Sequence, residues 1–96
     1  FHNFPRLLNH RGNQFSWHPD AKGGLHLKIR STGHPKGQLL VTNCTLRRHD
    51  CKDDLVMAFI DTAIELGWKH DRSRRDCFWL EEDVCSSVLD AVRSAG

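Results

Sequence analysis

A helical pattern between Cys51 and Gly67 constrains the fold of this chain more than any other feature. Apolar residues recur there at the three- and four-residue spacing of a helix with one buried side: Leu55, Val56, Phe59, Ile60, Ala63 and Ile64. Asp53 and Asp54 can accept hydrogen bonds from N–H groups at the helix start and suit the positive end of its dipole. Gly67 suits the left-handed conformation that ends a helix, and Trp68 is placed to fold back onto the last turn. The pattern therefore predicts the central helix of the core.

Strands are predicted on both sides of this helix. Residues 25–31 alternate apolar and polar side chains, which is typical of a strand with one buried side. Residues 38–45 are rich in β-forming residues and predict a second strand, separated from the first by a wide turn over residues 32–37. The run Phe78-Trp79-Leu80 predicts a buried third strand. Residues 81–96 then predict a second amphipathic helix with an acidic start.

The chain of 96 residues is expected to form a single domain, residues 1–96. Residues 1–24 show no sustained period and predict an irregular arm, or an edge strand over residues 14–18. Residues 25–96 predict a core in the order ββαβα. A mainly antiparallel sheet of three or four strands with both helices on one face would bury every apolar side in two layers. We therefore predict an α+β two-layer sandwich.

Four cysteines are present, the even number that two disulfide bonds require. The spacings Cys44-x6-Cys51 and Cys77-x7-Cys85 differ from the close pairs of zinc sites, so we favour disulfides over zinc and over buried thiols. Of the three possible connectivities, we favour Cys44–Cys85 with Cys51–Cys77, because both bonds would join the helices to the sheet. We expect no metal site and no cofactor.

Charge is distributed unevenly along the sequence. Residues 1–49 contain eight Lys and Arg against one acid, and residues 50–96 contain six against eleven. We favour a mixed surface on which the two halves attract each other, the alternative being a basic face for an anionic partner such as RNA. The two densest basic clusters supply the candidate binding residues: Arg47, Arg48, Lys69, His70, Arg72, Arg74 and Arg75. If the clusters lie close together, Trp68 would be available beside them for stacking.

Catalytic residues are not predicted, although two arrangements bear on catalysis. His26, Lys28 and Arg30 share the polar side of a strand, as the base, acid and cation of small secreted ribonucleases do, but His49 or His70 would have to complete the set. Cys51 lies at a helix start, where a thiolate could be stabilised. We therefore favour a non-enzymatic function and leave catalysis open.

The second half of the chain has its features in the following order from Cys51 onward: a cysteine, a helix, Gly67-Trp68, a loop, Cys77-Phe78, and Asp83-Val84 opening the last helix. This order resembles the core of fungal secreted effectors of the necrosis-inducing and killer-toxin type. The resemblance implies a secreted, disulfide-cross-linked α/β sandwich with toxin or host-manipulating activity. We expect a secreted effector that binds a host or competitor protein or an anionic surface. The alternatives are a small secreted ribonuclease and an intracellular nucleic-acid-binding module. No apolar run is long enough for a membrane span, and the oligomeric state is not predicted.

Overall fold

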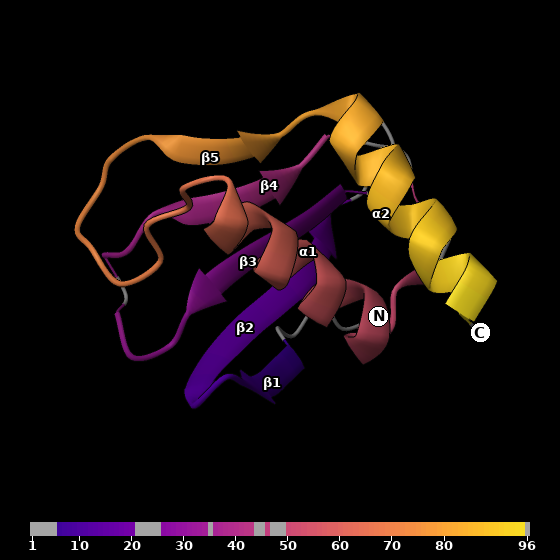
Figure 1. Cartoon of the computed structure of the whole chain (residues 1–96). Coiled ribbons are helices and arrows are strands. Elements are labelled where there is room, and N and C mark those ends of the chain that lie inside the picture. The colour runs from indigo at the N-terminus through magenta and orange to yellow at the C-terminus, as the bar shows by residue number, and fades with distance from the viewer. Residues whose placement is uncertain (1–5, 21–25, 35, 44–45, 47–49, 96) are drawn as a thin grey trace.

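The computed structural model describes residues 6–20, 26–34, 36–43, 46 and 50–95. It contains one five-stranded sheet in chain order, with two helices (Figure 1). The elements are β1 (Arg6–His10), β2 (Asn13–Asp20), β3 (His26–Ser31), β4 (Leu39–Thr42), α1 (Asp53–Glu65), β5 (Cys77–Leu80) and α2 (Glu82–Ala95). Neighbouring strands are antiparallel from β1 to β4, and β5 is parallel to β4. The predicted α+β class and mainly antiparallel sheet are confirmed, but the predicted strand number is wrong because the sheet has five strands.

The additional strand belongs to a hairpin near the N-terminus. β1 and β2 pair from Arg6↔Trp17 to His10↔Asn13, and the chain turns through Arg11 and Gly12, whose φ angles are 51° and 77°. Two successive positive φ angles are typical of a two-residue type I′ turn, which usually carries Asn or Gly at the first position. The predicted strand over residues 14–18 exists, but it is an inner strand paired with both β1 and β3. The irregular arm predicted for residues 1–24 is therefore wrong over residues 6–20.

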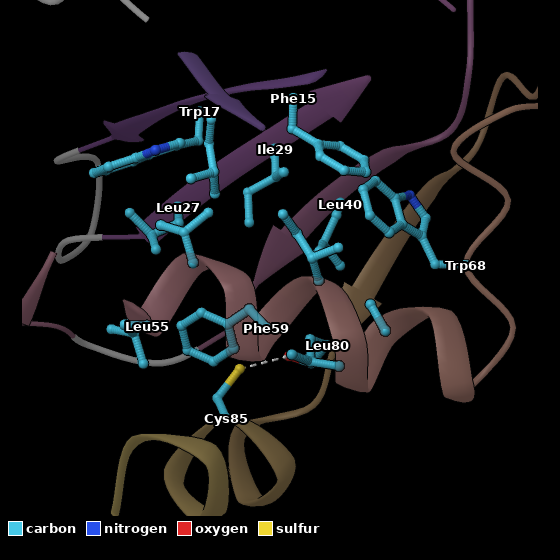
Figure 2. Close-up of a cluster of buried hydrophobic side chains, with 14 of the residues drawn as sticks. Phe15, Trp17, Leu27, Ile29, Leu40, Leu55, Phe59, Trp68, Leu80 and Cys85 are labelled. Carbon is cyan, nitrogen blue, oxygen red and sulfur yellow. Dashed lines mark hydrogen bonds between the residues drawn. The ribbon is translucent and has the colours of Figure 1, made fainter. Parts of the chain in front are cut away.

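α1 lies across one face of the sheet and buries the predicted apolar side (Figure 1). Figure 2 shows Phe59 of α1 between the sheet, where Leu27 and Ile29 lie, and Cys85 of α2. The Gly67 amide donates to the Ile64 carbonyl at 3.1 Å, and the Trp68 amide to the Ala63 carbonyl at 2.8 Å. With a φ of 108° at Gly67, these two bonds form a Schellman motif. The predicted end of the helix is therefore confirmed.

The start of α1 differs from the prediction. Lys52 occupies the N-cap position, and its side chain makes no capping hydrogen bond. Asp53 and Asp54 lie in the first turn, where their charge still suits the helix dipole. The acidic residues therefore contribute through charge at this end.

α2 lies on the same side of the sheet as α1 and packs against α1. Figure 2 shows it beyond α1, on the side of that helix facing away from β2 and β3. Its buried residues are Cys85 and Leu89, and the Cys85 thiol donates to the Leu80 carbonyl at 3.3 Å. Both helices therefore lie on one side of the sheet, but α2 packs mainly on α1 and forms a third layer, so the predicted two-layer sandwich is wrong. Neither helix of the described chain has the length and apolar character needed to cross a membrane.

Among the described cysteines the structure shows no disulfide bond: Cys51, Cys77 and Cys85 are thiols. The predicted Cys51–Cys77 bond is wrong because Cys77 opens β5 and pairs with Leu39 at the start of β4, whereas Cys51 precedes α1 at the opposite end of these strands (Figure 1). Disulfide bonds need Cα atoms within about 7 Å. The predicted partner of Cys85, Cys44, lies outside the described residues.

Candidate functional site

The basic loop that follows α1 folds back against the turn before β4. Gly37 and Ser73 form an isolated antiparallel bridge, and the Arg74 amide donates to the Lys36 carbonyl at 3.2 Å. Figure 1 shows this loop passing beside the start of β4. Two segments that are far apart in the sequence therefore form one continuous surface.

Gln38 holds both ends of this loop. The Gln38 amide donates to the Lys69 carbonyl at 3.2 Å, and the Lys69 amide donates to Gln38 Oε1 at 3.0 Å. Gln38 Nε2 donates to Asp76 Oδ2 at 3.2 Å, while the Gln38 carbonyl accepts from Trp68 Nε1 at 2.8 Å. Gln38 is buried and its bond to Trp68 is shielded from competing water, whereas its side-chain bonds to Lys69 and Asp76 are partly buried. Together these four bonds fix the loop relative to the sheet.

Trp68 belongs to the core and not to the surface of the loop. Its side chain is only 3% exposed, and its ring centroid lies 5.9 Å from Phe15 and 5.4 Å from His70. His70 also packs edge-on against Phe15 at 5.4 Å. The prediction that Trp68 is available for stacking is wrong, because the Schellman turn directs it back onto the sheet. His70 is half-buried in the same aromatic cluster and supports the loop from inside.

Five basic residues are exposed on this loop and turn, and we call them the basic rim: Lys36, Lys69, Arg72, Arg74 and Arg75. Arg74 forms two hydrogen bonds with the Asp76 carboxylate, from Nε at 3.1 Å and Nη2 at 3.2 Å. These bonds raise the pKa of Arg74 and lower the pKa of Asp76. Asp71 is the other acid of the loop and is also exposed. Basic charge therefore exceeds acidic charge on this surface.

The structure brings together four of the predicted binding residues: Lys69, Arg72, Arg74 and Arg75. It adds Lys36, which was not predicted from the sequence because its contact with the loop depends on how β4 and the loop pair. Arg47 and Arg48 lie outside the described residues.

The acidic first turns of the two helices lie away from the basic rim. The first turn of α1 contains Asp53 and Asp54 and lies beside the last turn of α2, where Arg93 pairs with Asp50. The first turn of α2 contains Glu82 and Asp83 and follows the end of β5. The basic rim lies at the start of β4 and β5, and we call the region of these two first turns the acidic end.

Some opposite charges from the two halves do meet, as predicted for a mixed surface. Asp61 Oδ1 lies 2.7 Å from both Arg11 Nε and His10 Nε2, which ties the first hairpin to α1. Within the second half, Arg93 Nη2 lies 2.7 Å from Asp50 Oδ2. Both pairs lie away from the basic rim, so they leave its charge unchanged.

The face of the sheet opposite α1 carries a second group of chemically interesting side chains, and we call it the open face. Since Leu27 and Ile29 are buried under α1, His26, Lys28 and Arg30 point the other way. The strand register places His18 directly opposite Lys28. Among the described residues, no helix covers this face (Figure 1). The predicted grouping of His26, Lys28 and Arg30 is confirmed, and His18 is an addition that depends on the register of β2.

Cys51 is not placed as a nucleophile. Burial raises the pKa of its thiol, and the neighbouring Asp50 carboxylate raises it further, against an opposing effect of Arg6. The thiolate that nucleophilic attack requires is therefore disfavoured, which contradicts the stabilised thiolate suggested for this helix start. Within the described ranges, no three His, Cys, Asp or Glu side chains are grouped to hold a metal ion.

Comparison with known proteins found no matching family model. No curated protein and no solved structure matches the chain.

Proposed function

We propose that this protein is a nucleic-acid-binding module that holds phosphates on the basic rim. The observation that carries the proposal is the bridge between Gly37 and Ser73, which joins Lys36 to the basic loop and makes one cationic surface from two segments. Lysine and arginine bind phosphates through charge and through hydrogen bonds. A surface of this kind, away from the acidic end, favours approach of a polyanion by one end of the molecule.

Binding should depend on salt, because phosphate contacts release counterions. The test is to measure the affinity for a labelled oligonucleotide at several salt concentrations, with and without the double substitution Arg72→Ala and Arg75→Ala. Each phosphate contact contributes roughly 0.7 to 0.9 to the slope of log affinity against log salt. We expect the double variant to bind more weakly and to flatten the slope by about one to two units.

Two single substitutions provide a matched control for this experiment. Lys69→Ala removes a charge from the basic rim, and Lys52→Ala removes the same charge at the acidic end; both side chains are exposed. Lys69→Ala should weaken binding while Lys52→Ala leaves it nearly unchanged, with both folds verified by circular dichroism. Equal effects of the two substitutions, or an affinity independent of salt, would contradict the proposal.

A secreted, toxin-like effector is the competing proposal, and it rests on the resemblance described above and on two disulfide bonds. It predicts an intact mass four hydrogen atoms below the reduced mass. The nucleic-acid-binding proposal instead predicts that Cys51, Cys77 and Cys85 are alkylated without reductant in denaturant, as peptide mapping would show. In the native state, Cys85 should react far more slowly, because it is buried and donates to the Leu80 carbonyl. Detection of a bridged peptide would favour the effector.

A ribonuclease is a second candidate, and the position of His18 favours it. His18, His26 and Lys28 occupy neighbouring positions on the open face, where one histidine would take the proton of a 2′-hydroxyl and another would protonate the leaving 5′-oxygen. His70, a possible partner from the sequence, packs on the other side against Phe15. The test is to incubate the protein with an RNA oligonucleotide. Cleavage that is lost in His18→Ala and does not occur with the 2′-deoxy analogue would show that the protein is a ribonuclease. If the RNA is recovered intact, the ribonuclease candidate is wrong and the binding proposal stands.

A further inference from the structure

Trp79 is the exposed aromatic residue nearest to the basic rim. It lies on β5, which begins two residues after Arg75. Its side chain is 59% exposed, whereas Trp17 and Trp68 are 1% and 3% exposed. Leu80, the next residue, is buried in the core, so Trp79 points toward the open face. The sequence predicts a buried strand here, and for Trp79 that prediction is wrong, because α1 covers only one side of β5.

The row of paired residues that contains Trp79 becomes polar and basic toward the middle of the sheet, beyond Val41. Trp79 pairs with Val41, Val41 with Lys28, and Lys28 with His18, so these residues form one row across β5, β4, β3 and β2. Val41 is buried beside Trp79, which gives the indole a firm apolar support. Lys28 therefore places one basic side chain on the open face in the same row as Trp79, two strands away from it.

Arg30 provides the link between the two surfaces. It occupies the open face of β3 and is exposed, and it lies next to Ser31, the last residue of β3 before the turn that carries Lys36. A strand of nucleic acid that contacts the basic rim would reach Arg30 and Trp79 without crossing the acidic end. The distance from the start of β5 to Trp79 is two residues, or about 7 Å.

We propose that Trp79 is a base-stacking platform for single-stranded nucleic acid whose phosphates contact the basic rim. This inference rests on the proposed function and specifies its ligand. An exposed indole on a sheet face can stack on any unpaired base, and such contacts tolerate different sequences because every base has a flat aromatic face. In a duplex these faces are already covered by neighbouring base pairs. A single strand is therefore the ligand that uses both the charge of the rim and the aromatic ring.

The test compares single-stranded and duplex oligonucleotides of equal length in binding to the wild type, Trp79→Ala and Trp79→Phe. For the single strand, Trp79→Ala should weaken binding about 5- to 150-fold, the range expected for loss of one stacked base. Trp79→Phe should recover most of this loss, because a smaller aromatic ring remains. The salt slope should stay unchanged in both variants, since no phosphate contact is removed.

Leu7→Ala is the matched control. Leu7 is 62% exposed, and its register opposite Ser16 places it on the open face at the far edge strand, β1. Four strand spacings separate β1 from β5, or about 19 Å. Leu7→Ala removes exposed apolar surface from the same face and should not change the affinity. A loss equal to that of Trp79→Ala would show that general apolar contact, and not stacking, is measured.

Intrinsic fluorescence provides a second measurement that separates this inference from the proposed function. Because Trp17 and Trp68 are buried, quenching by a bound single strand should arise from Trp79 and disappear in Trp79→Phe. Heparin, a polyanion without bases, should compete for the basic rim without quenching.

If the protein binds duplex and single strand equally, with no quenching and no effect of Trp79→Ala, the stacking inference is wrong while the basic rim stands. If no oligonucleotide binds in a salt-dependent manner, both proposals are wrong.

Discussion

Gly37 is the residue at which the turn before β4 and the basic loop come closest. A Cβ atom at Gly37 would clash with the backbone oxygen of His70 and would lie 2.9 Å from that of His34. Real Cβ atoms do not approach backbone oxygens this closely, so any other residue would force the two segments apart. Glycine at this position is therefore required by space, and the basic rim depends on it.

Substitution of Gly37 by alanine should weaken both the fold and the binding site. Overpacking of this kind costs about 1–3 kcal/mol of unfolding free energy, and displacement of the loop should also lower oligonucleotide affinity. Urea unfolding and the binding titration measure the two effects. Gly33→Ala is the control, because a Cβ atom at Gly33 would have no neighbouring atom within 4 Å. If the two variants behave alike, the close approach does not hold the rim together.

At the scale of elements, α1 is the part of the fold that could be predicted best. Its apolar spacing and its end at Gly67 are local properties of the sequence, and the structure confirms both. The β1–β2 hairpin was missed because its turn uses Arg11 before Gly12 in place of the usual residues. The exposure of Trp79 was missed because an apolar run does not show which of its residues will face an uncovered side of a sheet.

Phe59 provides the test of how α1 is placed. Its side chain is fully buried at the centre of the core, facing the sheet on one side and Cys85 of α2 on the other (Figure 2). Phe59→Ala should lower the unfolding free energy by about 3–5 kcal/mol. Leu66→Ala, at a residue 56% exposed just after the same helix, should change it by less than about 0.5 kcal/mol. Denaturant titration of both variants distinguishes them, and a small effect at Phe59 would mean that the buried side of α1 is wrongly assigned.

At the scale of the whole molecule, the candidate site depends on contacts that no local pattern contains. The sequence showed that residues 69–75 are basic, but Lys36 joins them only through the bridge between Gly37 and Ser73. His18 joins the open face only through the register of β2 with β3. The charge imbalance between the two halves of the sequence does not locate the basic rim, because four of its five residues belong to the acidic half. The parallel pairing of β4 and β5 places the rim at the start of both strands and the acidic start of α2 beyond their other end. Composition therefore predicted the kind of surface, and topology determined where it lies.

The late position of β5 in the chain has a consequence for folding. β1 to β4 pair with sequence neighbours, and contacts between neighbours form sooner because they close shorter loops. β5 can pair with β4 only after α1 has crossed between them, so we expect it to dock last. The basic rim and Trp79 both depend on that step. Local unfolding of β5 from β4 would disrupt the site while the antiparallel strands β1 to β4 stay paired. A bound ligand would stabilise the paired state of β5 by mass action. The protein would then be most completely folded when it is occupied.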